Sequence, residues 1–180
     1  MGAIRYPHKV KLIAAIMVSR PDLFSPVREE MASAFGPIDL ESVPYPFSFT
    51  DYYSKEMGVA LIKRIMSFAR LTDKEALASA KRRTNEMEDS YASEEGGTRR
   101  RSVNIDPGYV SDSKLVLAST KNFSHRIYIG QGIFAEVTMR YLRTGGFTPL
   151  EWTYPDYQTG PVLTFLERVR ERYMEQLKEG

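Results

Sequence analysis

The stretch that decides the fold is residues 10–19, with the sequence VKLIAAIMVS. Apart from Lys11 and the terminal Ser19, it consists of apolar residues, which therefore occupy both alternating sets of positions. An extended segment of this kind needs cover on both faces, as a strand in the middle of a sheet has. We therefore expect residues 10–19 to form a central strand.

The chain that follows this strand predicts a helix and two more strands. Apolar side chains recur at helical spacing over residues 20–35, and Gly36-Pro37 ends that helix. Residues 38–43 alternate as a short strand does, and a third strand is expected within residues 59–69.

The second half of the chain adds a second helix, a β-meander and a closing helix. Thr72 and Glu75 have the spacing of a capping box, which predicts that a helix begins beside them. A fourth strand is expected over residues 102–105, ended by a turn at Asp106-Pro107-Gly108. The remaining expected elements are a short helix (or a strand) over 111–119, a hairpin over 125–143, a strand over 147–151 and a helix from Pro161.

This order of elements predicts an α+β fold with a mixed, mostly antiparallel sheet. We expect a ferredoxin-like βαββαβ core, extended by a β-meander and a C-terminal helix, although other α+β sheets fit the same order. Within that core, the first and third strands are expected to run parallel, with the fourth antiparallel beside the first. No linker or repeat divides the chain, so we expect a single domain over residues 10–178 after an N-terminal tail at 1–9.

Composition excludes several classes of protein. The 180 residues carry 25 lysines and arginines, 23 aspartates and glutamates, two histidines and no cysteine. Disulfide frameworks, thiolate sites and multi-histidine zinc centres are therefore excluded, and the balanced charge argues against a dedicated nucleic-acid-binding protein. The longest aliphatic run, residues 12–18, is too short to span a membrane, so we expect a cytoplasmic protein.

Cross-strand matching in the expected hairpin indicates one polar pair. A three-residue loop, Gly130-Gln131-Gly132, places apolar partners on one face and pairs Arg126 with Glu136 on the other. This ion pair is either an ordinary surface salt bridge or the polar floor of a site for an anion. His125 falls on the apolar side, either as a hydrogen-bonded core histidine or as a catalytic group.

Two irregular aromatic segments, residues 44–56 and 151–160, supply further candidates. Long loops in compact domains are often functional. With the expected strand order, Asp51, Tyr52 and Glu56 approach Asp106 and Tyr109 at one rim of the sheet. Such carboxylates could hold a hard cation such as Mg²⁺ or share a proton, or they could simply cap loops. Trp152 in the second segment is a further candidate for ligand contact.

The known nucleotide and hydrolase motifs are absent. The glycine pairs at 96–97 and 145–146 and the 130–132 turn all lack the Lys-Ser/Thr of a phosphate loop. The sequence also has no GxGxxG, HExxH or GxSxG motif. Any nucleotide binding would therefore use another kind of pocket.

Several segments together resemble one protein family. They include FGPID (35–39), FSFTDYY (47–53), NIDPGY (104–109), SHRIY (124–128) and WTYPDY (152–157). This combination is similar to a bacterial and archaeal family catalogued as domain of unknown function 4416, over about residues 10–178. The resemblance supplies no established activity or catalytic residues. Some members carry a GTP-binding label, which the absent phosphate loop does not support.

The sequence therefore leads to one preferred function and two alternatives. We expect a domain that binds or acts on a nucleotide or phosphorylated small molecule, with no cofactor specified. Asp106, Asp51 and His125 are the catalytic candidates. The expected ligand contacts are Tyr52, Tyr109, Arg126, Glu136, Glu56 and Trp152. The alternatives are a protein- or RNA-interaction module that uses loop aromatics and Arg99–Arg101, and a homodimer formed through the closing helix.

Overall fold

The central strand lies where the sequence predicts it. The computed structural model describes residues 2–50 and 52–179. β1 (Val10–Val18) is buried at all nine positions. It pairs with β4 (Leu61–Thr72) on one side and with β7 (Val103–Val110) on the other. Both pairings are antiparallel, so the expected parallel arrangement of the first and third strands is wrong.

The reason for this correction lies in the connection between the second and third strands. β2 (Ile38–Glu41) pairs antiparallel with β4, and β4 lies between β1 and β2 in the sheet. β1 and β2 are joined by a helix that returns the chain to the same end of the sheet, so they share a direction. A strand inserted between them that opposes β2 must also oppose β1.

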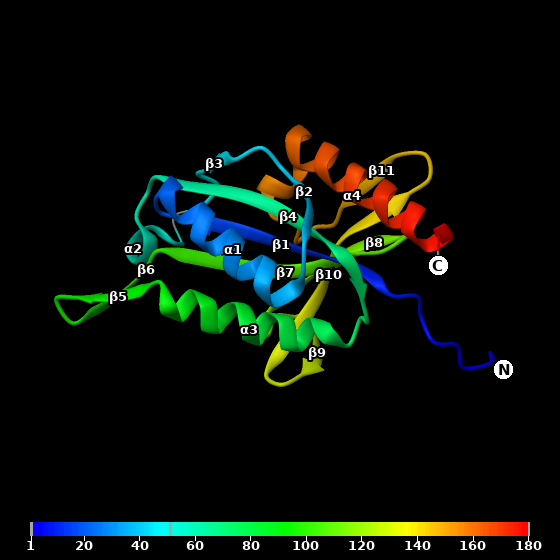
Figure 1. The fold of residues 1–180 in the computed structure, drawn as a ribbon, viewed down its shortest axis with the longest axis horizontal. Helices are drawn as coiled ribbons and strands as arrows, with labels where there is room; N and C mark the ends of the chain where they lie inside the picture. The colour runs from blue at the N-terminus through cyan, green and yellow to red at the C-terminus, as the bar shows by residue number, and fades with distance from the viewer. Residues whose placement is uncertain (1, 51, 180) are drawn as a thin grey trace.

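One sheet runs through the whole molecule (Figure 1). Its order is β11-β10-β8-β7-β1-β4-β2, with β3 beside β4 and β9 beside β10. The predicted α+β class with a mostly antiparallel sheet is confirmed; the ferredoxin-like assignment stays a prediction. The bounds of the other strands in this sheet are β3 Tyr45–Phe47, β8 Lys114–Ser119, β9 Ile127–Gly130, β10 Ile133–Leu142 and β11 Gly146–Pro149.

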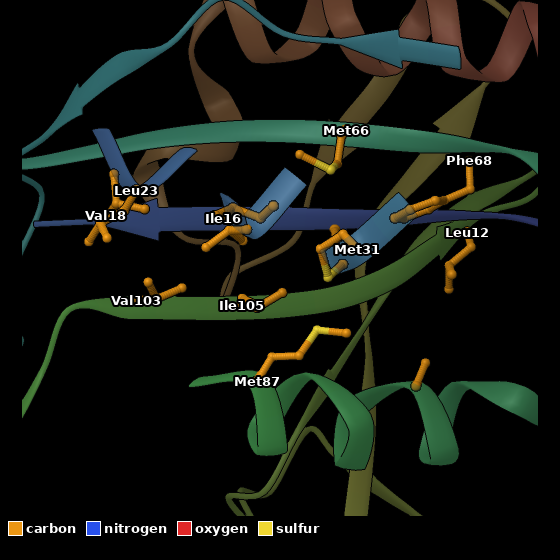
Figure 2. Packing of buried hydrophobic residues seen from close by; sticks show 13 residues of the cluster. Leu12, Ile16, Val18, Leu23, Met31, Met66, Phe68, Met87, Val103 and Ile105 are labelled. Carbon is orange, nitrogen blue, oxygen red and sulfur yellow. The ribbon is translucent and has the colours of Figure 1, made fainter. Parts of the chain in front are cut away.

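Helices cover both faces of the sheet. α1 (Phe24–Phe35) and α3 (Ala76–Ser90) pack over one apolar cluster, whereas α4 (Gly160–Glu179) packs over a second cluster. Figure 2 shows the first cluster, in which Ile16 of β1 lies among side chains from β4, β7 and α1. α1 ends at Phe35 and is capped by Gly36, whose φ of 97° favours glycine. The remaining helical turns are the 3-10 turns η1 (Pro21–Leu23) and η2 (Pro155–Gln158) and the short helix α2 (Ser54–Met57).

Some predicted boundaries and types of individual elements differ from the structure, because several segments form strands beyond the apolar runs that identify them. Thr72 is the last residue of β4 and pairs with Val10, so it does not cap α3, which begins at Ala76. Residues 114–119 form the strand β8, so of the two alternatives expected for residues 111–119 the strand is confirmed and the helix is wrong. The segment that contains Arg99–Arg101 is part of a hairpin of β5 (Ala92–Glu95) and β6 (Thr98–Arg101), which projects from the body of the fold (Figure 1).

The aromatic segments are also more regular than expected. Residues 44–56 contain β3 and most of α2, and residues 151–160 contain η2. Within the described part of the chain, no helix is both long and apolar enough to cross a membrane.

Candidate functional site

A polar pocket lies where β7 and β8 separate. The two strands pair at only three positions, and the last pair is Gly108 with Leu117. β7 extends back from there to Val103, paired only with β1, while β8 continues to Ser119 beside β10. Separation begins beside Pro107, which has no N–H to donate to a neighbouring strand. The resulting gap opens a cavity of about 180 Å³.

Charged side chains line this polar pocket. Among its described lining residues, five cations face four carboxylates. The cations are Lys63, Lys81, Arg101, Lys121 and Arg126. The carboxylates are Glu88, Asp106, Glu136 and Asp156. So many charges around one small cavity point to a site for a polar ligand rather than an apolar one.

Asp106 occupies one wall of the polar pocket. Its Oδ1 accepts a hydrogen bond from the Lys81 Nζ at 3.1 Å, and its Oδ2 accepts one from the Asn104 amide at 2.8 Å. Burial alone would raise the pKa of Asp106, but the ammonium groups of Lys81 and Lys63 outweigh it, and the pKa lies below its usual value. Asp106 is therefore held as a carboxylate.

Glu88 lies on the other side of Lys81 and behaves in the opposite way. Its Oε1 accepts a hydrogen bond from the Ile105 N–H at 2.8 Å and lies 3.6 Å from the Lys81 Nζ. Burial raises the pKa of Glu88 above its usual value, although Lys81 acts against this shift. Two carboxylates with oppositely shifted pKa values beside one lysine form an arrangement suited to proton transfer.

The floor of the polar pocket contains a buried ion pair. The Lys63 Nζ and the Tyr45 hydroxyl both donate to Oδ2 of Asp156, at 2.6 and 3.1 Å. The other oxygen, Oδ1, and the hydroxyl of the adjacent Tyr157 are buried without a hydrogen-bond partner among the described residues. Buried polar atoms in folded proteins are almost always paired, so these two atoms indicate a place for water or a ligand.

The predicted pair of Arg126 and Glu136 is present, although the hairpin register differs in part. Arg126 Nε donates to Glu136 Oε2 at 2.7 Å, and both side chains are nearly buried. Tyr128 faces Phe134 and Ile127 faces Ala135 as expected, but Gly130 rather than Ile129 faces Ile133. A bulge at this point accommodates the shift, and β9 begins only at Ile127. Arg126 therefore reaches Glu136 from a loop.

The rim of the polar pocket carries one cation with no carboxylate partner among the described residues. Lys121 follows β8, is exposed, and places its Nζ 3.9 Å from the centre of the Tyr52 ring. This cation–π contact holds the ammonium group beside the cavity without neutralising it.

Comparison with known protein families identifies one family to which the chain belongs. Residues 8–173 match a family described as a domain of unknown function, DUF4416. The chain belongs to the DUF4416 family. The predicted resemblance is thus confirmed over nearly the whole sequence. No curated protein and no solved structure matches the chain.

In this DUF4416 chain, four of the predicted site residues line the polar pocket together. They are Asp106, Tyr52, Arg126 and Glu136. The geometric reasoning behind this grouping was wrong: Asp106 lies opposite Ala15 within β7, not at a strand end near the start of β1. The grouping arises because Tyr53, which precedes α2, and Met57 of α2 pack against Met17 and Leu61, where β1 ends and β4 begins.

The other predicted residues lie elsewhere in the DUF4416 chain. Glu56 pairs with Arg101 at 2.7 Å, beside the polar pocket. Tyr109, His125 and Trp152 line a second, apolar cavity. His125 Nε2 lies 3.1 Å from Oε2 of Glu136, which lines both cavities. Asp51 lies outside the described residues. Among the described residues, no three His, Asp or Glu side chains gather closely enough to hold a metal ion, so the suggested Mg²⁺ site has no support.

Sequence reasoning missed most of the pocket's charged residues. The many charged residues of α3 indicate a solvated face, yet Lys81 and Glu88 follow Leu77 by four and eleven residues. That spacing continues the buried side of the helix and could have identified both residues. Lys63 and Asp156 are 93 residues apart and carry no such signal.

The arginines of β6 have interaction partners, although Arg99 and Arg100 are exposed. Arg99 pairs with Asp89, and Arg101 pairs with Glu56 and Glu88. Arg100 donates to the Lys55 carbonyl at 3.1 Å. Binding of RNA or protein through these arginines stays a prediction that no observation favours.

Proposed function

We propose that the polar pocket binds a small, hydroxylated anion, specifically a phosphorylated metabolite. The observation that carries this proposal is a pair of buried atoms, Asp156 Oδ1 and the Tyr157 hydroxyl, in a pocket with Lys121 at its rim. Neither atom has a hydrogen-bond partner, and Lys121 has no carboxylate partner, among residues 2–50 and 52–179. Hydroxyl groups of a ligand would satisfy the two buried atoms, and its phosphate would neutralise the lysine.

The size of the pocket narrows the class of ligand. Its 180 Å³ corresponds to roughly six water molecules at about 30 Å³ each. An apolar cavity of about 150 Å³ holds a single benzene ring. A short polyol phosphate fits within such a space, whereas an intact nucleotide would extend out of it. We therefore prefer a small phosphorylated metabolite over a nucleotide.

Each part of the pocket has a distinct role in this proposal. Lys121 contacts the phosphate at the rim, with Arg126 close by, since Arg126 donates to the Lys121 carbonyl at 3.1 Å. Asp156 accepts a hydrogen bond from a ligand hydroxyl on the floor. Asp106 and Glu88 supply the groups that exchange protons with the bound molecule.

Thermal-shift measurements test this proposal. We expect glycerol phosphate to raise the melting temperature, because a ligand present at a hundred times its Kd adds about 2.7 kcal/mol to stability. Glycerol alone and AMP should have much smaller effects, the first because it lacks the anion and the second because of its size. Failure of both inorganic phosphate and glycerol phosphate to stabilise the protein would contradict the proposal.

Replacing Lys121 by alanine should weaken the binding of glycerol phosphate about tenfold or more, because a hydrogen bond to a charged group contributes about 1.5–3 kcal/mol. Isothermal titration calorimetry measures this change. The matched control is Lys178→Ala, which removes an exposed lysine near the end of α4, away from the pocket. Equal affinities in the two variants would show that the anion binds elsewhere.

A further inference from the structure

A second cavity, of about 560 Å³, lies between α3 and the neighbouring part of the sheet. Its walls come from the start of α3 and from β7, β8, β9 and β10. The main apolar lining side chains are Leu77, Tyr109, Val116, Ile127, Ile129 and Val137. This volume falls within the range of about 300–1,000 Å³ that is typical of small-molecule sites.

One side of this apolar cavity is a set of stacked rings. The His125 and Trp152 rings lie 5.0 Å apart and within 10° of parallel, and Phe123 stacks on the other side of His125. The Trp152 indole N–H donates to the Val137 carbonyl at 2.9 Å, which fixes the ring beside β10. A ligand therefore meets a rigid aromatic surface.

Cations gather where β8 begins. Lys114 is the first residue of β8 and lines the cavity two residues before Val116. Lys74 also lines the cavity, one helical turn before Leu77, which packs against Val116. Arg140 lies opposite Lys114 in the register. None of these three cations forms an ion pair with a carboxylate of a described residue, and Glu75 and Glu136 are the acidic residues of the lining.

We propose that this apolar cavity binds an amphipathic organic anion, with an aromatic or aliphatic body and a single acidic group. The body would cover Ile127 and Val137, which are 70% and 37% exposed. The acidic group would lie near Lys74 and Lys114. Burial of apolar area drives the association, and the lysines select an anionic ligand over a neutral one. This proposal rests on observations other than those that carry the polar-pocket proposal, although Glu136 lines both cavities.

The probe for the test is anilinonaphthalene sulfonate, an aromatic anion that fluoresces when it leaves water. Trp152 is the only tryptophan of the chain, so its emission reports directly on the cavity. We expect saturable binding of one probe per chain, with quenching of Trp152 in parallel. A signal that does not saturate, or one that leaves the Trp152 emission unchanged, would overturn the proposal.

Two variants locate the probe. Lys114→Ala should weaken binding of the sulfonate about tenfold but change the affinity for uncharged phenylnaphthylamine less than about twofold. Lys178→Ala, outside the cavity, should affect neither. Ile127→Asp should abolish binding of both probes, and circular dichroism should show an unchanged fold because Ile127 is exposed.

Two outcomes would contradict the assignment. If both probes bind Lys114→Ala and Ile127→Asp as they bind the unmodified chain, the ligand site is not this cavity. If light scattering shows a dimer that Ile127→Asp dissociates, this face is an interface between two copies of the chain instead.

Discussion

Asp156→Ala should lower the free energy of unfolding by about 3–5 kcal/mol, because it leaves the charge of Lys63 buried without a partner. The Asp156 side chain is fully buried, and that of Lys63 is 8% exposed. The rings of Phe47 and Tyr157 lie 5.0 and 4.7 Å from the Lys63 Nζ and compensate only part of the loss. Urea denaturation measures the change.

Two further variants test whether the unpaired charge of Lys63 is what destabilises Asp156→Ala. Lys63→Met combined with Asp156→Ala should recover much of the lost stability, because no unpaired charge then remains buried. Asp22→Ala removes an aspartate from the exposed Arg20–Asp22 pair and should cost only about 0–1 kcal/mol. If Asp156→Ala is no more destabilising than Asp22→Ala, the pair on the pocket floor does not contribute as described.

Gly108→Ala should destabilise the fold by about 1–3 kcal/mol or more, because the added methyl group has no space. A Cβ atom at this position would lie 2.3 Å from the Val116 carbonyl oxygen and 2.5 Å from Leu117 Cδ2. The first of these atoms belongs to the backbone of β8, so β7 and β8 would have to move apart. Since they separate just beyond this pair to form the polar pocket, binding of glycerol phosphate should also weaken.

The control for this prediction is Gly145→Ala. Gly145 has an ordinary backbone conformation, and the nearest atom to an added Cβ is Thr148 Oγ1 at 3.9 Å. This change should leave stability unchanged or raise it by about 0.4–1 kcal/mol through a less flexible unfolded chain. Thermal melts of the two variants side by side give the comparison, and equal melting temperatures would contradict the close approach of β7 and β8.

Predictions from the sequence succeeded where the pattern of a short segment reflects the burial or pairing of that same segment. The doubly apolar run at 10–19 identified the central strand, and hairpin matching identified the Arg126–Glu136 pair. The expected strand direction was wrong, because the direction of β4 relative to β1 depends on the strand order. β4 lies between β1 and β2 and runs antiparallel to both. Tyr52 and Asp106 do line the same pocket, but the parallel strand direction from which this grouping was predicted is wrong.

The sequence by itself determined the α+β class, the buried middle of the sheet and the DUF4416 membership. These properties depend on the periodicity of apolar residues and on short motifs, which a single chain displays in order. Only the tertiary structure decided that Lys63 meets Asp156, that Lys81 lies between Asp106 and Glu88, and that β7 leaves β8 at Gly108. Each of these contacts joins different elements, and its energy depends on distance and burial rather than on neighbours along the chain.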